Sequence, residues 1–84
     1  MKYKINKGFI VEKIEGKTII YDEKKSVLYT FNETASYIFK KIKQGKEKEE
    51  IIELIIKRYN ITKKRADKDV ENLISELLKN KIVS

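Results

Sequence analysis

The sequence predicts an α+β fold that is winged helix-turn-helix-like, with a three-stranded antiparallel β-meander followed by three α-helices. Two observations carry this prediction. Up to Phe31 the apolar residues alternate with a period of two, as in half-buried strands, and after Asn32 they recur at helical spacing. The chain has 84 residues, three glycines and no proline, so we expect short connections within a single domain, residues 1–84.

Three segments of the N-terminal half are predicted to be strands. The first is Phe9 to Ile14, and a turn follows in which Gly16 can supply a positive φ. The second strand is Thr18 to Tyr21, and a charged turn leads from it into the third, Ser26 to Phe31. Strands joined by such tight connections favour an antiparallel meander.

Three helices are predicted to follow. The first begins after Asn32, whose side chain can accept a hydrogen bond from the first turn, and runs to about Lys43. The second runs from about Glu47 to Tyr59. The third runs from about Lys63 to Asn80, with Thr62 as its expected N-cap.

The composition excludes several kinds of chemistry. There is no cysteine and no histidine, so the chain offers no disulfide, no thiol nucleophile, no zinc site of the usual Cys/His kind and no imidazole base. No carboxylates are paired across a plausible cleft of the predicted fold. We therefore expect a protein that is not an enzyme and that uses no cofactor and no metal.

The two ends of the chain give weaker signals. Residues 1–7 are basic and lack the apolar core of a secretory signal, so they are expected to be a frayed end or an arm. No segment approaches the roughly 20 apolar residues of a membrane span, and we expect a cytoplasmic location without membrane association. Lys81 to Val83 forms either a final β bridge or a tail, and the sequence leaves both open.

The net charge of +7 raises the question of nucleic-acid binding. Of the 20 basic residues, 18 are lysine and only Arg58 and Arg65 are arginine, whereas base and phosphate recognition usually relies on the arginine fork. We interpret the charge as a solvated lysine-rich surface and regard nucleic-acid binding as the less favoured alternative.

The run from Tyr21 to Ala35, Tyr-Asp-Glu-Lys-Lys-Ser-Val-Leu-Tyr-Thr-Phe-Asn-Glu-Thr-Ala, resembles the PqqD-like proteins. These are small peptide-recognition elements that present ribosomally made precursor peptides to tailoring enzymes. The family's usual pattern is an acidic turn, a short aromatic strand and then Leu-Asn-Glu-Thr-Gly opening a helix. Here Phe31 stands for the leucine and Ala35 for the glycine.

The resemblance extends over roughly Gly8 to Val83. The pair Asp69-Val70 precedes the apolar residues of the third helix, and Ile82 with Val83 corresponds to the family's terminal apolar residues. It implies a stand-alone recognition element (RRE) of natural product biosynthesis that acts as a peptide chaperone. Such an element binds a leader peptide by strand addition to the third strand, beside the third helix, and presents it to a modifying enzyme or leader peptidase.

An exposed edge strand suits this use, because its unpaired N–H and C=O groups can pair with an extended peptide. The third strand would supply that ladder. We expect Phe31 to belong to the core, and Tyr29 either to line the peptide groove or to be core. The predicted strand residues of the site are Ser26, Val27, Leu28, Tyr29 and Thr30.

The third helix would supply the other wall of the groove. Its apolar stripe leaves one flank with Arg65, Asp69, Asn72 and Glu76, and a second flank with Asp67, Glu71 and Leu78. We expect the first flank to face the groove because Asp69-Val70 matches the family pattern, and lysines near the helix start to meet acidic leader residues. The predicted helix residues of the site are Lys64, Arg65, Lys68, Asp69, Asn72, Leu73 and Glu76.

Two other functions stay open. The second and third helices could form a DNA-binding helix-turn-helix, with Lys57, Arg58, Lys63, Lys64, Arg65 and Lys68 near the break between them. Acidic residues interleaved along the third helix oppose this alternative. A third alternative is a homodimer through the edge strand. For the favoured function, the resemblance suggests a radical-SAM enzyme or a lasso-type leader peptidase as partner, and the sequence does not separate them.

Overall fold

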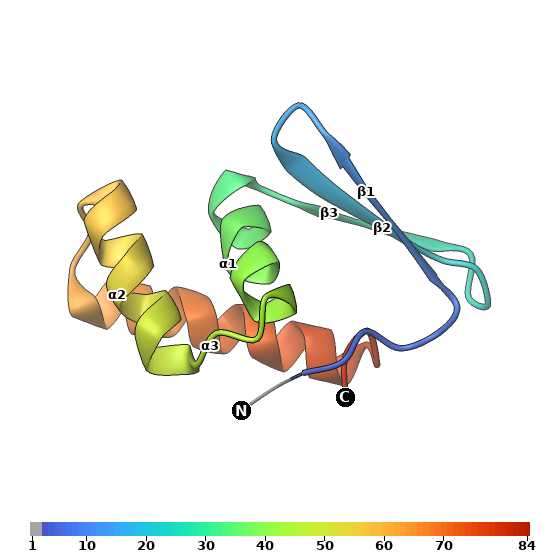
Figure 1. Cartoon of the computed structure of the whole chain (residues 1–84). Helices are drawn as coiled ribbons and strands as arrows, with labels where there is room; N and C mark the ends of the chain where they lie inside the picture. Colours follow the sequence, from blue (N-terminus) through green and yellow to red (C-terminus); the bar gives the residue numbers. More distant parts are fainter. Residues whose placement is uncertain (1–2) are drawn as a thin grey trace.

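Three antiparallel strands are followed by three helices in the computed structural model, which describes residues 3–84 (Figure 1). This is the winged helix-turn-helix-like α+β architecture that the sequence predicts. The elements are β1 (Phe9–Ile14), β2 (Lys17–Asp22), β3 (Val27–Phe31), α1 (Glu33–Lys43), α2 (Lys48–Tyr59) and α3 (Lys63–Lys79).

The sheet is a meander with the order β1-β2-β3. The β1–β2 loop consists of Glu15 and Gly16, with φ of 50° and 80°, which is the backbone of a type I′ hairpin turn. The β2–β3 loop ends at Ser26, where φ is 54°. β3 therefore begins at Val27, and the predicted start of this strand was wrong by one residue.

The junction between β3 and α1 is held by two side chains. The Asn32 side-chain oxygen accepts the N–H of Ala35 at 2.8 Å, which confirms Asn32 as the N-cap. The buried Ser36 hydroxyl accepts the N–H of Thr18 at 2.8 Å and donates to the C=O of Phe31 at 3.3 Å. One hydroxyl thus ties the first turns of α1 to the ends of β2 and β3.

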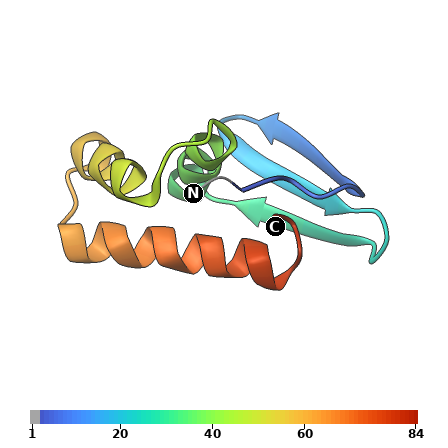
Figure 2. The same ribbon diagram turned by 60° about the horizontal axis from the view of Figure 1, so that its bottom comes forward.

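The core joins the inner face of the sheet to all three helices. Phe31 packs edge-to-face on Phe39 with ring centroids 5.8 Å apart, so the expectation that Phe31 is core is confirmed. The central helix is α1, which packs on β2, β3, α2 and α3. By contrast, no Cα of α3 lies within 8 Å of a Cα of β3, although Figure 2 shows both elements on the same side of α1.

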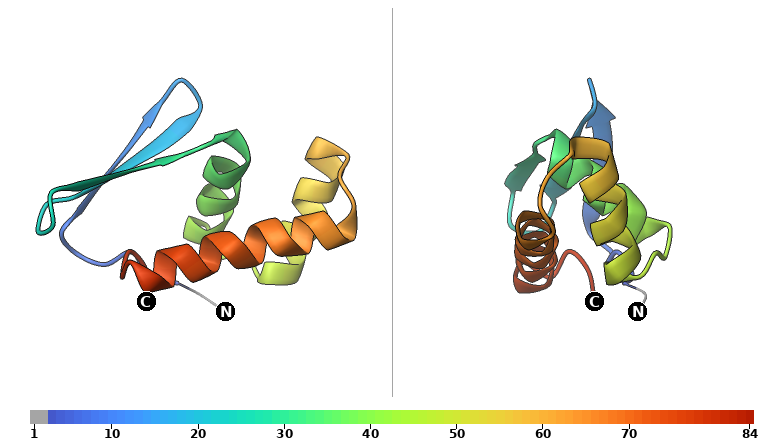
Figure 3. Two further views of the ribbon diagram at one scale, coloured as in Figure 1. Left: turned by 180° about the vertical axis from the view of Figure 1, so that it is seen from behind. Right: turned by 90° about the vertical axis from the view of Figure 1, so that its left-hand side faces the viewer.

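The two ends of the described chain meet. Ile5 and Val83 form an antiparallel β bridge, and Lys4 and Ser84 exchange backbone hydrogen bonds of 3.0 Å. The final segment is therefore the β bridge rather than a tail, and its residues Ile82 and Val83 are buried. Figure 3 shows both ends beside the C-terminal end of α3. Residues 1 and 2 of the expected N-terminal arm lie outside the described residues.

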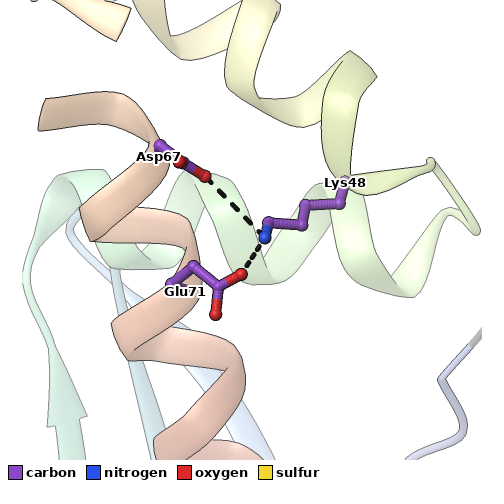
Figure 4. Close-up of polar contacts among 3 residues, drawn as sticks. All are labelled: Lys48, Asp67 and Glu71. Carbon is purple, nitrogen blue, oxygen red and sulfur yellow. Dashed lines mark hydrogen bonds and ion pairs between the residues drawn. The ribbon is translucent and has the colours of Figure 1, made fainter. Parts of the chain in front are cut away.

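An ion-pair cluster joins α2 to α3 (Figure 4). The ammonium group of Lys48, at the start of α2, lies 3.7 Å from the carboxylate of Asp67 and also contacts that of Glu71. Thr62 caps α3 by accepting the N–H of Arg65 at 3.2 Å, as the sequence predicts. The flank of α3 that carries Asp67 and Glu71 consequently faces α2.

Candidate functional site

The outer edge of β3 is unpaired within the described residues. The two residues that flank a two-residue hairpin turn, here Ile14 and Lys17, form a hydrogen-bonded pair, and such pairs alternate along an antiparallel ladder. Counting along β2, the backbone groups of Ile20 point toward β3, where Tyr29 is the partner. The N–H and C=O groups of the intervening Leu28 and Thr30 therefore point away from the sheet.

These outward-pointing groups make β3 a template for one more strand. Both Leu28 and Thr30 are exposed, and the Leu28 side chain is 61% exposed. Ser26, which the sequence places in the ladder, belongs to the preceding turn. Val27 is in the strand but is 38% exposed, because the helices cover only the far end of β3.

A cavity of about 670 Å³ lies beside the end of β3. Its walls come from the last residues of β3, the first turns of α1 and one flank of α3. Apolar side chains, among them Ala35, Ile38 and Leu73, contribute part of the lining. The remaining lining residues are Thr30, Phe31, Asn32, Thr34, Arg65, Asp69, Asn72, Ser75, Glu76 and Lys79.

Part of the predicted site lines this one cavity. It is lined by the predicted residues Thr30, Arg65, Asp69, Asn72, Leu73 and Glu76. The flank of α3 that carries Asp69 thus borders the cavity, whereas the other flank faces α2 through Lys48. Lys64 and Lys68 are exposed and lie outside the lining. Tyr29 is half-buried and packs against the core without lining the cavity.

Sequence reasoning missed the contribution of α1. Thr34, Ala35 and Ile38 line the cavity because α1 starts directly after β3 and so borders the same space. The short connection at Asn32 was a signal that could have indicated this. On α3, Ser75 and Lys79 were also missed, although both lie within one turn of Glu76 on the predicted flank.

The charges around the cavity are balanced. Arg65 and Lys79 are opposed by Asp69 and Glu76, and the Arg65 Nε lies 3.9 Å from the Asp69 carboxylate at i,i+4 spacing. An exposed pair of this kind contributes about 0 to 1 kcal/mol, so it affects the orientation of a ligand more than its affinity. Among residues 3–84 there is no group of three or more metal-ligating side chains.

The basic residues near the α2–α3 break lie in different surroundings. The Arg58 guanidinium lies 4.6 Å from the ring centroid of Tyr37 and 5.8 Å from that of Tyr59. Arg65 lies beside Asp69 at the cavity. Each arginine thus has a partner within the protein, although both arginines are exposed, as are the lysines at this break. No helix in the described part of the chain is long and apolar enough to cross a membrane.

The family model for coenzyme PQQ synthesis protein D (PqqD) matches residues 17–83. The chain belongs to the PqqD family. The matched range runs from β2 to the buried Val83, so the PqqD match includes β3, α1 and α3, the three elements around the cavity. No curated protein matches the sequence.

Two solved structures share the fold of this PqqD-family chain. One is TbiB1 in complex with the TbiA(beta) leader peptide, at 18% identity and a TM-score of 0.85, covering 100% of this chain and 95% of that one. The other is a lasso peptide synthetase B1 complexed with the leader peptide, at 15% identity and a TM-score of 0.91, covering 100% and 99%. At these identities the likeness shows that the PqqD-family fold is shared.

Proposed function

We propose that this protein binds the leader segment of a ribosomally synthesised precursor peptide and presents it to a modifying enzyme or a leader peptidase in the cytoplasm. The observation that carries the proposal is the open edge of β3 next to a cavity lined by α3. Membership of the PqqD family supports it, as does the fold shared with two proteins whose structures contain leader peptides. The protein itself would only bind, and the chemistry would belong to its partner.

Strand addition explains how β3 would hold the leader. A peptide residue opposite Leu28 or Thr30 would exchange backbone hydrogen bonds with the outward-pointing groups, each worth about 0.5 to 1.5 kcal/mol net. Successive peptide side chains would point to opposite faces of the extended sheet. Half of them would therefore point toward the cavity, where Leu73 and Ile38 offer apolar contact.

The other half would lie on the outer face of the sheet. There Ile10, Tyr21 and Leu28 are cross-strand neighbours in one row, and all three are exposed. This apolar row ends at the free edge of β3. A peptide with an apolar side chain opposite Leu28 would extend the row by one member and reduce its contact with water.

The partner enzyme would act while the leader stays on β3. A radical-SAM enzyme and a lasso-type leader peptidase are both compatible with a protein that only binds, and this chain does not separate them. The backbone of β3 would make the same hydrogen bonds with any peptide sequence. The choice of leader would therefore come from the side chains that line the cavity and from the charges beside it.

The test is a titration monitored by fluorescence anisotropy. A labelled leader of a candidate precursor peptide is titrated with the protein in moderate salt, alongside a labelled random DNA duplex. We expect saturable leader binding that depends weakly on salt, and a weak duplex signal that falls steeply with salt. Tight duplex binding without a leader response would overturn the proposal in favour of the DNA-binding alternative.

A further inference from the structure

A second cavity lies beside the C-terminal end of α3. It has a volume of about 240 Å³ and lies between the N-terminal segment, the β2–β3 turn and the end of α3. The two cavities are neighbours at this end of α3, because Lys79 lines the larger one and the next residue, Asn80, lines the smaller one; we call the two together the groove. On the strand side, Lys25 in the turn lies two positions before the start of β3.

The smaller cavity is rich in lysine. Its lining includes Lys7, Lys24, Lys25 and Lys81, all exposed, and its one carboxylate is Asp22. Among residues 3–84, none of these lysines has an acidic group within 4.0 Å. Four lysines thus line one space, and none of them forms an ion pair with another described residue.

Asp22 forms no ion pair with these lysines, so the lining carries four cations against one anion. Asp22 is only 3% exposed, and one carboxylate oxygen accepts the backbone N–H groups of Lys24 at 3.0 Å and Lys25 at 3.2 Å. These bonds fix the turn and leave the two lysine side chains at the surface. Glu23 is in the same turn, but it is exposed and does not line the cavity.

The net charge of the groove therefore differs between its two ends. Its larger cavity has balanced charges, and the end near the start of β3 is strongly positive. A solvated cluster of four lysines with a single carboxylate has a net positive charge, so it favours an anionic ligand and raises the local concentration of acidic groups. Lys64 and Lys68, the lysines that the sequence favours for this role, lie near the opposite end of α3.

We propose that the lysines of the smaller cavity select leader peptides that carry a cluster of Asp or Glu residues next to the strand-forming segment. This inference rests on the proposed function. Lys25 lies three positions before Leu28, so at about 3.3 Å per residue the acids would lie roughly three to five positions beyond the peptide residue opposite Leu28. They would be C-terminal to the paired segment if the peptide runs antiparallel to β3, and N-terminal if it runs parallel.

The test is a selection from a yeast-displayed library of random 16-residue peptides against the intact protein. We expect the enriched peptides to combine an alternating apolar segment with two or more acids on one side of it, and that side reports the direction of the peptide. A synthetic copy of an enriched peptide should bind the triple variant Lys24→Gln, Lys25→Gln, Lys81→Gln about tenfold more weakly than the wild type.

The matched control is Lys13→Gln, Lys40→Gln, Lys57→Gln, which removes the same charge from exposed positions outside both cavities. We expect a change of less than about twofold there. An equal loss in both variants would overturn the inference, because the acids would then respond to net charge alone. Enriched apolar segments without acids would overturn it and leave the proposed function intact, whereas a selection that enriches no peptide would overturn both.

Discussion

The two edge strands of the sheet, β1 and β3, differ in whether charged residues accompany their unpaired backbone groups. β1 carries Glu12 and Lys13 in its second half, whereas β3, Val-Leu-Tyr-Thr-Phe, carries no charge at all. Charged residues on an edge strand are a common protection against unwanted pairing. β1 is therefore built as an edge that stays unpaired. The uncharged β3, with a cavity beside one end, lacks this protection, as the proposed strand addition requires.

The two edges also differ in how firmly they are held. β3 is fixed at its end by the Ser36 hydroxyl and by Phe31 in the core, and α1 packs on it. No helix in the described part of the chain packs on β1 to a similar extent. A binding strand held against a rigid helix loses less entropy when a peptide pairs with it. The difference suggests that rigidity is concentrated where binding is proposed.

The largest effect that we predict concerns this attachment. Ser36→Ala leaves the buried Thr18 N–H without its acceptor, so the free energy of unfolding should fall by about 1 to 3 kcal/mol. Urea denaturation followed by circular dichroism measures the change. Ser75→Ala, on an exposed face of α3, is the control and should change stability by less than about 0.5 kcal/mol. Equal stabilities of the two variants would show that the hydroxyl is not needed to hold β3.

The next prediction compares the two edges directly. Leu28→Pro removes an outward-pointing N–H of β3 and should weaken leader binding about tenfold in the anisotropy titration. Lys13→Pro removes an outward-pointing N–H from β1 and should leave leader binding unchanged.

Both proline variants need a fold check by circular dichroism. Unchanged leader affinity in a folded Leu28→Pro variant would exclude the third strand as the binding site. Sedimentation of the wild type tests the homodimer alternative in the same samples. A dimer that Leu28→Pro converts to a monomer would mean that the β3 edge pairs with a second copy.

The smallest predicted effect concerns the helix wall of the cavity. Asp69→Arg removes the Arg65 partner and reverses one charge at the cavity, so leader affinity should change about two- to fivefold without loss of the fold. Glu53→Arg, an equal charge change at an exposed position of α2, should have no such effect. Identical affinities for these two variants would place the bound peptide away from this flank of α3.

The local features of the fold were predictable from the sequence. The positions of Asn32 and Thr62 as N-caps follow from side chains that bond the next turn, and such signals need no knowledge of the tertiary structure. The change of period after β3 gave the order of strands and helices for the same reason. The resemblance of residues Tyr21 to Ala35 identified the PqqD family, and this run lies inside the range that the family model matches, residues 17–83.

Features that depend on long-range packing were harder to predict. The alternation in β3 placed Val27 and Phe31 on one face, but only Phe31 is buried, because α1 covers one end of the strand. The terminal bridge between Ile5 and Val83 joins residues at opposite ends of the sequence, so no local pattern could show it. The short connection at Asn32 indicated that α1 starts beside the end of β3, but which α1 side chains line the cavity also depends on how α1 packs on α3, and no single motif encodes that packing.

The uncharged edge of β3 also bears on how the protein behaves at high concentration. An unoccupied, apolar edge strand is the part of a molecule from which aggregation starts. Here the net charge of +7 makes two copies repel each other, over a screening length of about 8 Å at physiological ionic strength. The lysines that dominate the composition would then keep the protein dispersed. Concentrated salt would screen this repulsion and allow the open edges of β3 in two copies to approach each other.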